Sequence, residues 1–168
     1  IGHIGRFIYQ KNHDFLIDIF DAIHQKYQHS KLLLIGSGEL EQQIKEKVST
    51  LHLEHEILFL GVREDVHKFM QAMDLFLLPS HFEGLPIVAV EAQTAGLPCV
   101  LSDTITDETV ITGNIKFLSL EKTREEWADE ILSFHSSFKR CLTDNKIRQA
   151  GFDQESQIKE IESLYTVK

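Results

Sequence analysis

Residues 31–38 read Lys-Leu-Leu-Leu-Ile-Gly-Ser-Gly, an apolar run that ends in a glycine-rich break. A continuous apolar run of this length indicates a strand buried on both faces, as in a parallel sheet. The following segment, from Glu39 to Leu51, has helical periodicity. Strand, break and helix in this order predict one unit of an α/β fold.

The same alternation recurs on both sides of this unit. We expect strands over His3–Phe7, Lys31–Ile35, Ile57–Leu60, Leu75–Leu78, Cys99–Leu101 and Ile115–Leu118. We expect helices over Asp14–Tyr27, Glu39–Leu51, Asp65–Met73, Pro86–Ala95, Arg124–Phe138, Asp144–Gly151 and Asp153–Tyr165. The sequence therefore predicts one α/β domain over residues 1–168, a parallel sheet with helices on both faces. Such sheets bind ligands outside the carboxyl ends of their strands, so the loops there are the places to search for a site.

Composition narrows the class of partner. The chain has 168 residues, with 17 Lys and Arg against 26 Asp and Glu, and a formal net charge of −9. This charge argues against a protein that binds nucleic acid and against a basic protein that binds membrane surfaces, but it permits the binding of a small anion by local donors. A chain of this length can bury a core that needs no disulfide or metal.

The cysteines indicate a cytoplasmic setting, and the start of the chain indicates a fragment. Cys99 and Cys141 form no Cys-x-x-Cys pair, so we expect both thiols to be reduced. No apolar run approaches the roughly 20 residues of a membrane span. The start, Ile1-Gly2-His3, lacks an initiator Met and a signal-type segment, so we expect a piece of a longer protein.

The loop after the fourth expected strand is the richest in candidate chemistry. It holds His81, Glu83, Gly84 and Pro86, and Glu91 follows eight residues after Glu83 in the next helix. A glycine lets the backbone approach a ligand closely, and a helix start favours phosphate. Carboxylates suit the vicinal hydroxyls of a ribose or hexose.

The expected burial of Glu91 favours a functional role for this segment over an ordinary surface position. Its neighbours from Ile87 to Ala95 are apolar nearly all round, which predicts that Glu91 is buried. A buried acid needs a partner or a ligand. The alternative is that Glu83 and Glu91 are solvated surface acids, and that His81 is an ordinary loop residue.

A second candidate cluster lies near the start of the chain. Arg6 is expected at the end of the first strand and Lys11 in the loop before the first helix, and residues 1–13 carry no acidic residue. A guanidinium and an ammonium together suit a diphosphate. Because the first and fourth strands end at the same edge of the sheet, we expect this cluster near the Glu83 loop.

Other patterns argue against other enzymes. Gly36-Ser37-Gly38 lacks the third glycine of a dinucleotide motif, since Glu41 stands there, so an NAD enzyme is disfavoured. That loop could approach a ligand or form a tight turn. His52 and His55 do not build a convincing metal site, and Trp127 is expected in the core.

A long ordered run resembles a known family. It consists of Phe59-Leu60-Gly61, Asp65-Val66, Met73-Asp74, Pro79-Ser80-x-x-Glu83-Gly84-Leu85-Pro86, Glu91-Ala92 and Gly96-x-Pro98-x-Val100-x-Ser102-Asp103. This run resembles the carboxy-terminal domain of retaining GT-B glycosyltransferases of group 1 (family 4). The segment from Gly5-Arg6-Phe7 to Phe15 resembles the family's opening, and its form Gln10-Lys11-Asn12-His13 is similar to that of bacterial exopolysaccharide and capsule enzymes.

The resemblance implies a Rossmann-like half of a GT-B enzyme that uses a nucleotide-diphospho-sugar, with UDP favoured, and needs no metal or cofactor. It implies catalytic roles for Arg6 and Lys11 at the diphosphate and for Glu83 at sugar hydroxyls. The substrate-binding residues would be Gly5, Val62, Arg63, His81, Gly84, Leu85, Pro86 and Glu91. Glu91 would hold the ribose, and the backbone near Val62 and Arg63 would read the base.

The resemblance also implies partners outside this chain. Residues 1–152 would form the Rossmann-like core, and residues 153–168 a helix that crosses toward an amino-terminal acceptor domain. The acceptor would be a glycan or a lipid-linked sugar, which would place the enzyme in the cytoplasm, near the inner face of the membrane through that other domain.

One departure and one alternative remain open. Thr104-Ile105-Thr106-Asp107-Glu108-Thr109 stands where the family often has a Gly-Gly pair and a Glu, so the role of the 104–114 loop is undecided. The alternative is a non-catalytic GT-B-like module that binds a nucleotide or a partner protein. The presence of Arg6, Lys11, Glu83 and Glu91 together disfavours that alternative.

Overall fold

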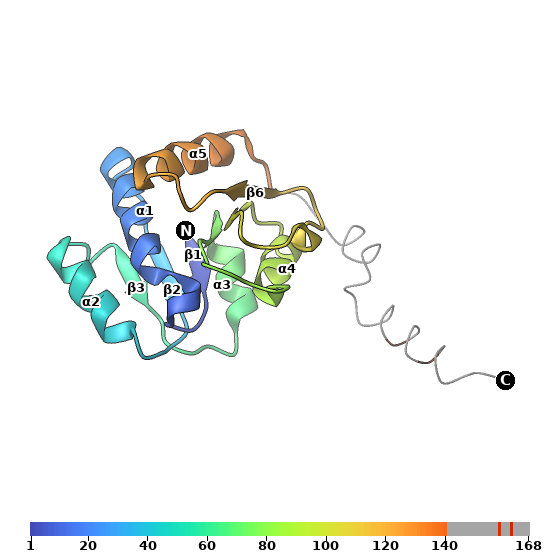
Figure 1. Cartoon of the computed structure of the whole chain (residues 1–168), viewed down its shortest axis with the longest axis horizontal. Helices are drawn as coiled ribbons and strands as arrows, with labels where there is room; N and C mark the ends of the chain where they lie inside the picture. Colours follow the sequence, from blue (N-terminus) through green and yellow to red (C-terminus); the bar gives the residue numbers. More distant parts are fainter. Residues whose placement is uncertain (141–157, 159–161, 163–168) are drawn as a thin grey trace.

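The structure is a computed structural model that describes residues 1–140, 158 and 162. Within residues 1–140, six parallel strands form one sheet in the order β3-β2-β1-β4-β5-β6 (Figure 1). The strands are β1 (Gly2–Ile4), β2 (Leu32–Ile35), β3 (Ile57–Phe59), β4 (Phe76–Leu78), β5 (Cys99–Ser102) and β6 (Ile115–Leu118). This order is that of a Rossmann-like sheet, and it confirms the predicted α/β class.

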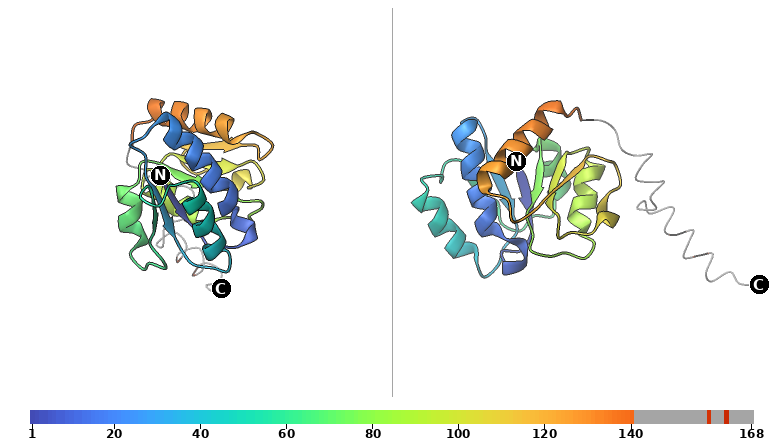
Figure 2. Two further views of the ribbon diagram at one scale, coloured as in Figure 1. Left: turned by 90° about the vertical axis from the view of Figure 1, so that its left-hand side faces the viewer. Right: turned by 45° about the horizontal axis from the view of Figure 1, so that its top comes forward.

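Helices cover both faces of the sheet, as predicted (Figure 2). They are α1 (His13–Lys26), α2 (Glu41–Thr50), α3 (Val66–Ala72), α4 (Ile87–Thr94) and α5 (Arg124–Ser137), with short 3-10 turns η1 (Tyr9–Lys11) and η2 (Asp107–Thr109). Helices α1, α2 and α5 share one apolar core with the sheet, and α3 and α4 share the other. Each large apolar side chain buried in these two cores contributes about 1.5–3 kcal/mol.

Helix α5 is fixed at its start and along its buried face. Thr123 caps it in a reciprocal capping box with Glu126, which satisfies backbone N–H groups of the first turn. Trp127 is fully buried, as predicted, and its Nε1 donates to the carbonyl of Ser119 at 2.9 Å. Its ring meets that of Phe15 edge to face, with 5.7 Å between centroids, so α5 is held against α1.

The first strand is shorter than the sequence predicts. Strand β1 ends at Ile4, because the following residues bind the loop after β2 instead of continuing the ladder. Phe7 donates its N–H to the carbonyl of Ser37 at 3.0 Å and accepts from the N–H of Leu40 at 3.0 Å. Arg6 therefore lies in a loop, not at the strand end where it was expected. The other expected boundaries within the described residues agree to within a few residues.

The glycines after β2 serve the packing of these two loops. Gly36 has φ of 138°, and a Cβ there would lie 2.0 Å from the carbonyl oxygen of Gly5. A Cβ on Gly38 would lie 2.5 Å from the carbonyl oxygen of Phe7. Of the two interpretations left open by the sequence, the structure supports the tight turn against the protein's own backbone.

The expected helix at 144–151 and Cys141 lie outside the described residues. Of the expected helix at 153–165, only residues 158 and 162 are described, and both are helical. Cys99 is fully buried in β5, and burial raises the pKa of its thiol far above the ordinary range. Among the described residues, no helix is both long and apolar enough to cross a bilayer.

Candidate active site

Two loops meet at the carboxyl edge of the central strands. The η1 turn follows β1, and the segment 79–86 follows β4, the neighbour of β1 in the sheet. Lys11 Nζ lies 2.5 Å from Glu83 Oε1, and the two side chains are 15% and 8% exposed. A cation from one loop and a carboxylate from the other thus share one largely buried site, as the common sheet edge predicts.

The Glu83 carboxylate accepts hydrogen bonds from two neutral side chains as well. Ser80 Oγ donates to Oε1 at 2.8 Å, and Gln10 Nε2 donates to Oε2 at 3.1 Å. Gln10 Nε2 also donates to the carbonyl of Phe82 at 3.1 Å. Because hydrogen bonds to an ionised acceptor are strong, these donors fix the carboxylate in position.

His81 joins the two loops through both its backbone and its ring. Its N–H donates to the carbonyl of Gln10 at 2.8 Å. Its imidazole stacks on the ring of Tyr9, with 4.3 Å between centroids, and Tyr9 is 68% exposed. The two rings therefore form part of the solvent-facing rim beside Glu83.

Strand β5 supports the site from its other side. Ser102 Oγ and Thr104 Oγ1 both donate to the carbonyl of Ser80, at 2.5 and 2.9 Å. Ser80 and Ser102 are fully buried. Thr104, at the beginning of the 104–114 loop, thus binds Ser80, and Ser80 in turn binds Glu83. The loop therefore contributes to the structure of the site.

The remaining predicted residues of the two loops surround this pair with fewer contacts. Gly5 lies between the buried ring of His3 and the Lys11 stem, since a Cβ there would be 3.0 Å from His3 Nε2 and 3.2 Å from Lys11 Cδ. Arg6 and Gly84 are exposed, and a Cβ on Gly84 would have nothing within 4 Å. Leu85 is exposed too, and the buried Pro86 caps α4 with an extended backbone.

The prediction that Glu91 is buried is wrong. Its side chain is exposed, because α4 packs into the core through Ala89 and Ala92 and leaves Glu91 on its outer face. On that outer face Ile87 is 57% exposed. The apolar composition of the segment therefore does not imply burial all round.

Val62 and Arg63 lie farther along the same edge of the sheet. They follow β3, which is separated from β1 by β2. Val62 is 75% exposed, and the Arg63 guanidinium pairs with Asp65 through two bonds of 3.0 and 3.2 Å. Arg63 also lies over the ring of Phe69, 5.0 Å from its centroid. None of the described hydrogen bonds joins this group to Lys11 or Glu83.

Two buried histidines beneath the site were missed by sequence reasoning. His3 Nδ1 bonds the carbonyl of Leu77 at 2.8 Å, whereas neither ring nitrogen of His13 has a partner among the described residues. The rings of His3 and His13 meet edge to face at 4.6 Å, and that of Phe7 stacks on His13 at 4.1 Å. Burial lowers the pKa of His3 to about 4 and that of His13 to about 2, so both are neutral.

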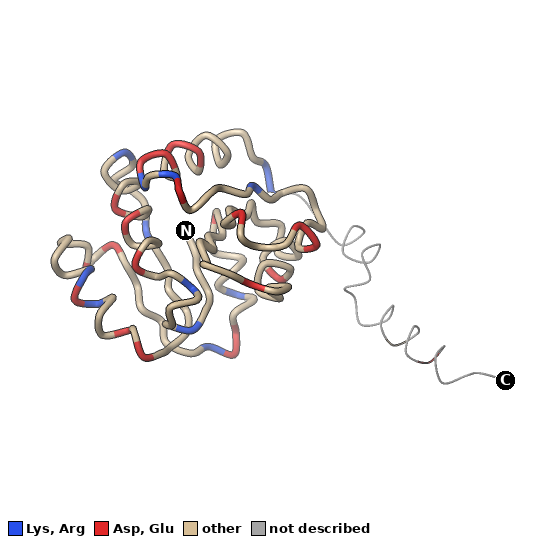
Figure 3. The backbone as a smooth tube through the Cα atoms, viewed as in Figure 1, with Lys and Arg blue, Asp and Glu red and all other residues tan. Residues whose placement is uncertain are grey.

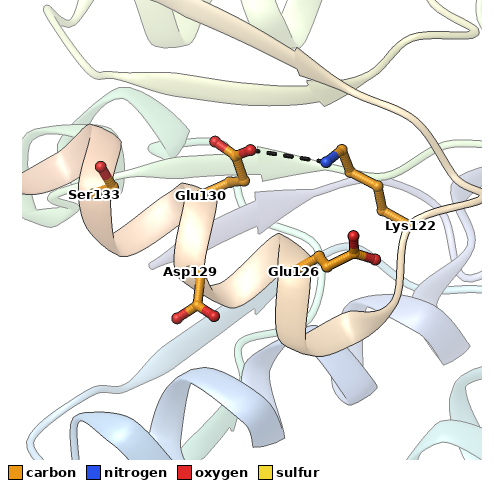
Figure 4. Close-up of a pocket in the computed structure, with 5 residues that line it drawn as sticks. All are labelled: Lys122, Glu126, Asp129, Glu130 and Ser133. Carbon is orange, nitrogen blue, oxygen red and sulfur yellow. Dashed lines mark ion pairs between the residues drawn. The ribbon is translucent and has the colours of Figure 1, made fainter.

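A hollow on the outer face of α5 offers a contrasting environment (Figure 4). It is lined by Lys122, Glu126, Asp129, Glu130 and Ser133. Lys122 is the one cation among these lining residues, and its Nζ lies 3.7 Å from Glu130 Oε1, so the charge of the hollow is mainly negative. Acidic segments are spread over several helices (Figure 3), and a hollow of this charge does not suit a diphosphate.

The order of the strands and the helices on both faces of the sheet are those of the Rossmann-like half of a GT-B fold. The chain belongs to the family described as Glycosyl transferases group 1, whose model matches residues 1–137. This confirms the resemblance to group 1 glycosyltransferases noted in the sequence.

Individual relatives agree with this assignment. The putative glycosyltransferase EpsF of Bacillus subtilis (strain 168) is 35% identical over 170 residues, which cover 99% of this chain and 44% of that protein. The UDP-Gal:alpha-D-GlcNAc-diphosphoundecaprenol alpha-1,3-galactosyltransferase of Escherichia coli is 28% identical over 176 residues, covering 96% of this chain and 44% of that protein. The crystal structure of Anabaena HepE in complex with UDP superposes with a TM-score of 0.78 at 24% identity, over 99% of this chain and 48% of that one. This chain therefore spans less than half the length of these proteins.

Proposed function

We propose that this chain is the carboxy-terminal, donor-binding half of a retaining glycosyltransferase that takes a sugar from a UDP-sugar and adds it to a glycan or lipid-linked acceptor. The observation that carries the proposal is the pairing of Lys11 with Glu83 at the carboxyl edge of β1 and β4. A nucleotide-diphospho-sugar has a charged diphosphate beside polar sugar hydroxyls, so it needs both a cation and a carboxylate within one site.

The diphosphate end of the donor would lie against the β1 loop. Arg6 is exposed there and available to a ligand, and Lys11 belongs to the adjoining η1 turn. A nucleotide diphosphate leaves readily when fixed cations and N–H groups stabilise its growing charge. We assign that stabilisation to Arg6 and Lys11 and to no metal ion.

The sugar and ribose would be held by the β4 loop and α4. Glu83 would accept from sugar hydroxyls, next to the backbone N–H groups of Gly84 and Leu85. Glu91 is exposed on α4, where its carboxylate is free to accept from the ribose hydroxyls. The remaining contacts would come from Gly5, His81 and Pro86, with the backbone near Val62 and Arg63 at the base.

The named relatives support the choice of UDP and of the acceptor class. HepE was crystallised with UDP, and the name of the Escherichia coli relative specifies UDP-Gal and a diphosphoundecaprenol-linked sugar. The acceptor would bind an amino-terminal domain outside this chain. With such an acceptor, the reaction would take place in the cytoplasm at the inner face of the membrane.

A calorimetric titration of the full-length protein with UDP, GDP, ADP and CMP tests the proposal. We expect saturable binding of UDP, and a loss of about tenfold or more in affinity for Glu91→Ala. Glu121→Ala, which removes an exposed acid before α5, is the matched control and should bind like the wild type. Absence of binding by all four nucleotides would refute the proposal, and unchanged turnover in Arg6→Ala would refute the catalytic assignment of Arg6.

A further inference from the structure

We infer that Gln10 is a positioning residue that holds Glu83 in place when the donor diphosphate engages Lys11. This inference rests on the proposed function of the same site. It assigns a role to a side chain that the sequence motif contains but does not explain.

The first step of the argument is the division of labour around the Glu83 carboxylate. Lys11 and Ser80 both donate to Oε1, whereas among the described residues Gln10 is the donor to Oε2. The same amide nitrogen of Gln10 also donates to the carbonyl of Phe82. Gln10 therefore fixes both the carboxylate of Glu83 and the backbone of the preceding residue, Phe82.

The second step is that the position of Gln10 does not depend on the Lys11–Glu83 ion pair. Its carbonyl accepts from the N–H of His81 at 2.8 Å, and the neighbouring Tyr9 ring stacks on the His81 ring. These contacts hold the η1 turn to the β4 loop through a backbone hydrogen bond and a ring contact, and neither involves the Lys11–Glu83 ion pair. They would persist when an anion binds nearby.

The third step is competition for the ammonium of Lys11. An ammonium is a mobile point charge with three N–H donors, so a diphosphate competes with Glu83 for it. The neutral amide of Gln10 is attracted far less to the incoming charge. When Lys11 turns to the diphosphate, Gln10 and Ser80 remain on Glu83 and keep its oxygens in a fixed orientation for the sugar hydroxyls.

This inference predicts a split between nucleotide and sugar recognition. In Gln10→Ala, we expect the affinity for UDP to stay within about twofold of the wild type, because Lys11 is still present. We expect the affinity for the preferred sugar nucleotide to fall by about tenfold, the effect of losing one hydrogen bond to a charged group. Gln10→Glu should lose at least as much, because a carboxylate cannot donate to Glu83 and repels it.

The test is calorimetry on the full-length protein with UDP, UDP-glucose, UDP-galactose and UDP-N-acetylglucosamine as probes. Gln42→Ala is the matched control, since Gln42 also donates its amide to a glutamate, Glu46, at 3.1 Å, but on the exposed surface of α2. We expect this control to bind every probe like the wild type.

The outcomes separate the two proposals. A wild-type protein that binds neither UDP nor any of the sugar nucleotides overturns the proposed function and this inference with it. A wild type that binds them, with Gln10→Ala and Gln10→Glu unchanged, overturns the role of Gln10 alone. An equal loss for UDP and the sugar nucleotide in Gln10→Ala also overturns it, because that result indicates a displaced η1 turn.

Discussion

Lys11 and Glu83 are 72 residues apart in the chain, yet the Lys11 ammonium lies 2.5 Å from the Glu83 carboxylate. The two side chains are 15% and 8% exposed, so water screens their attraction only in part. The residue proposed to bind the diphosphate is therefore paired in this structure with the residue proposed to bind the sugar. With the proposed roles, the donor diphosphate competes with Glu83 for the Lys11 ammonium.

Neutralising Glu83 should therefore have opposite effects on nucleotide binding and on catalysis. In Glu83→Gln, Lys11 loses its competing anion, and we expect UDP to bind about fivefold more tightly, about 1 kcal/mol. The rate of UDP release from a UDP-sugar should fall by about tenfold or more, because the amide of the variant lacks the two anionic oxygen acceptors of the carboxylate. Titration calorimetry and a UDP-release assay measure the two effects.

A matched variant controls for the loss of one carboxylate. Glu56 forms an ion pair with Lys31 just before β3, at the amino edge of the sheet. Glu56→Gln should change neither UDP affinity nor UDP release. If Glu83→Gln bound UDP more weakly than the wild type, the idea of competition for Lys11 would be wrong.

Two glycines that look equivalent in the sequence should behave differently when substituted. Gly36→Ala would place a Cβ 2.0 Å from a backbone oxygen at φ of 138°, so we expect it to lower the free energy of unfolding by about 3 kcal/mol or more. A Cβ on Gly84 meets nothing within 4 Å, so Gly84→Ala should change that free energy by less than about 1 kcal/mol.

Ligand binding distinguishes them again. If the backbone at Gly84 approaches the donor, Gly84→Ala should keep its stability and lose UDP-sugar affinity. Urea unfolding and calorimetry on the same preparations decide this. A Gly84→Ala protein that binds the donor like the wild type would show that the space above Gly84 is not used.

The buried histidines give a pH dependence whose sign follows from their pKa values. His3 and His13 have pKa values of about 4 and about 2, below the ordinary 6.5, so the unfolded chain takes up protons that the folded chain does not. Their contribution to stability is thus complete above about pH 6.5. It declines as the pH falls, by up to about 1.4 kcal/mol per pH unit for each histidine.

Replacing His13 by phenylalanine should remove one of these two contributions. Both ring nitrogens of His13 are buried without a partner among the described residues, so His13→Phe should be at least as stable as the wild type at pH 7.5. Between pH 6 and 4.5, the free energy of unfolding of His13→Phe should fall less steeply with pH than that of the wild type. The difference in slope should be that of about one bound proton, up to about 1.4 kcal/mol per pH unit. His67→Phe, at an exposed position of α3, is the control and should keep the wild-type slope. An unchanged slope in His13→Phe would contradict this account.

The sequence predicts those features of this protein that depend on local pattern. Apolar runs predicted all six described strands and the parallel sheet, and the shared carboxyl edge predicted that Lys11 comes near Glu83. The end of β1 was missed, because Phe7 turns to pair with the loop after β2, a contact between distant residues. The burial of Glu91 was misjudged because an apolar helix can still expose one side.

Residues that act through long-range hydrogen bonds leave no local signal. Gln10 and Ser80 are ordinary polar residues in sequence, and only the meeting of the β1 and β4 loops makes them donors to Glu83. His3 and His13 are two of nine histidines scattered through the sequence, and only the fold brings their rings into an edge-to-face contact. Gln93, in an apolar helix, gave no sign of its partners either.

The side chain of Gln93 binds the 104–114 loop, whose role the sequence left open. It is fully buried in α4, and its Nε2 donates to the carbonyl of Thr109 at 2.8 Å. Its Oε1 accepts from the N–H groups of Ile111 and Thr112 at 3.0 and 3.1 Å, and from Thr112 Oγ1 at 3.2 Å. One side chain thus supplies hydrogen-bond partners to three backbone groups of this loop.

Removing that side chain should loosen the loop and lower the stability of the protein. Gln93→Ala removes the hydrogen bonds that this side chain makes to backbone groups of Thr109, Ile111 and Thr112, so we expect a loss of about 2–4 kcal/mol in the free energy of unfolding. Hydrogen exchange should rise at the amides of Ile111 and Thr112, whereas Gln43→Ala, on the exposed face of α2, should change neither quantity. Unchanged exchange at both amides in Gln93→Ala would show that other contacts suffice to hold the loop.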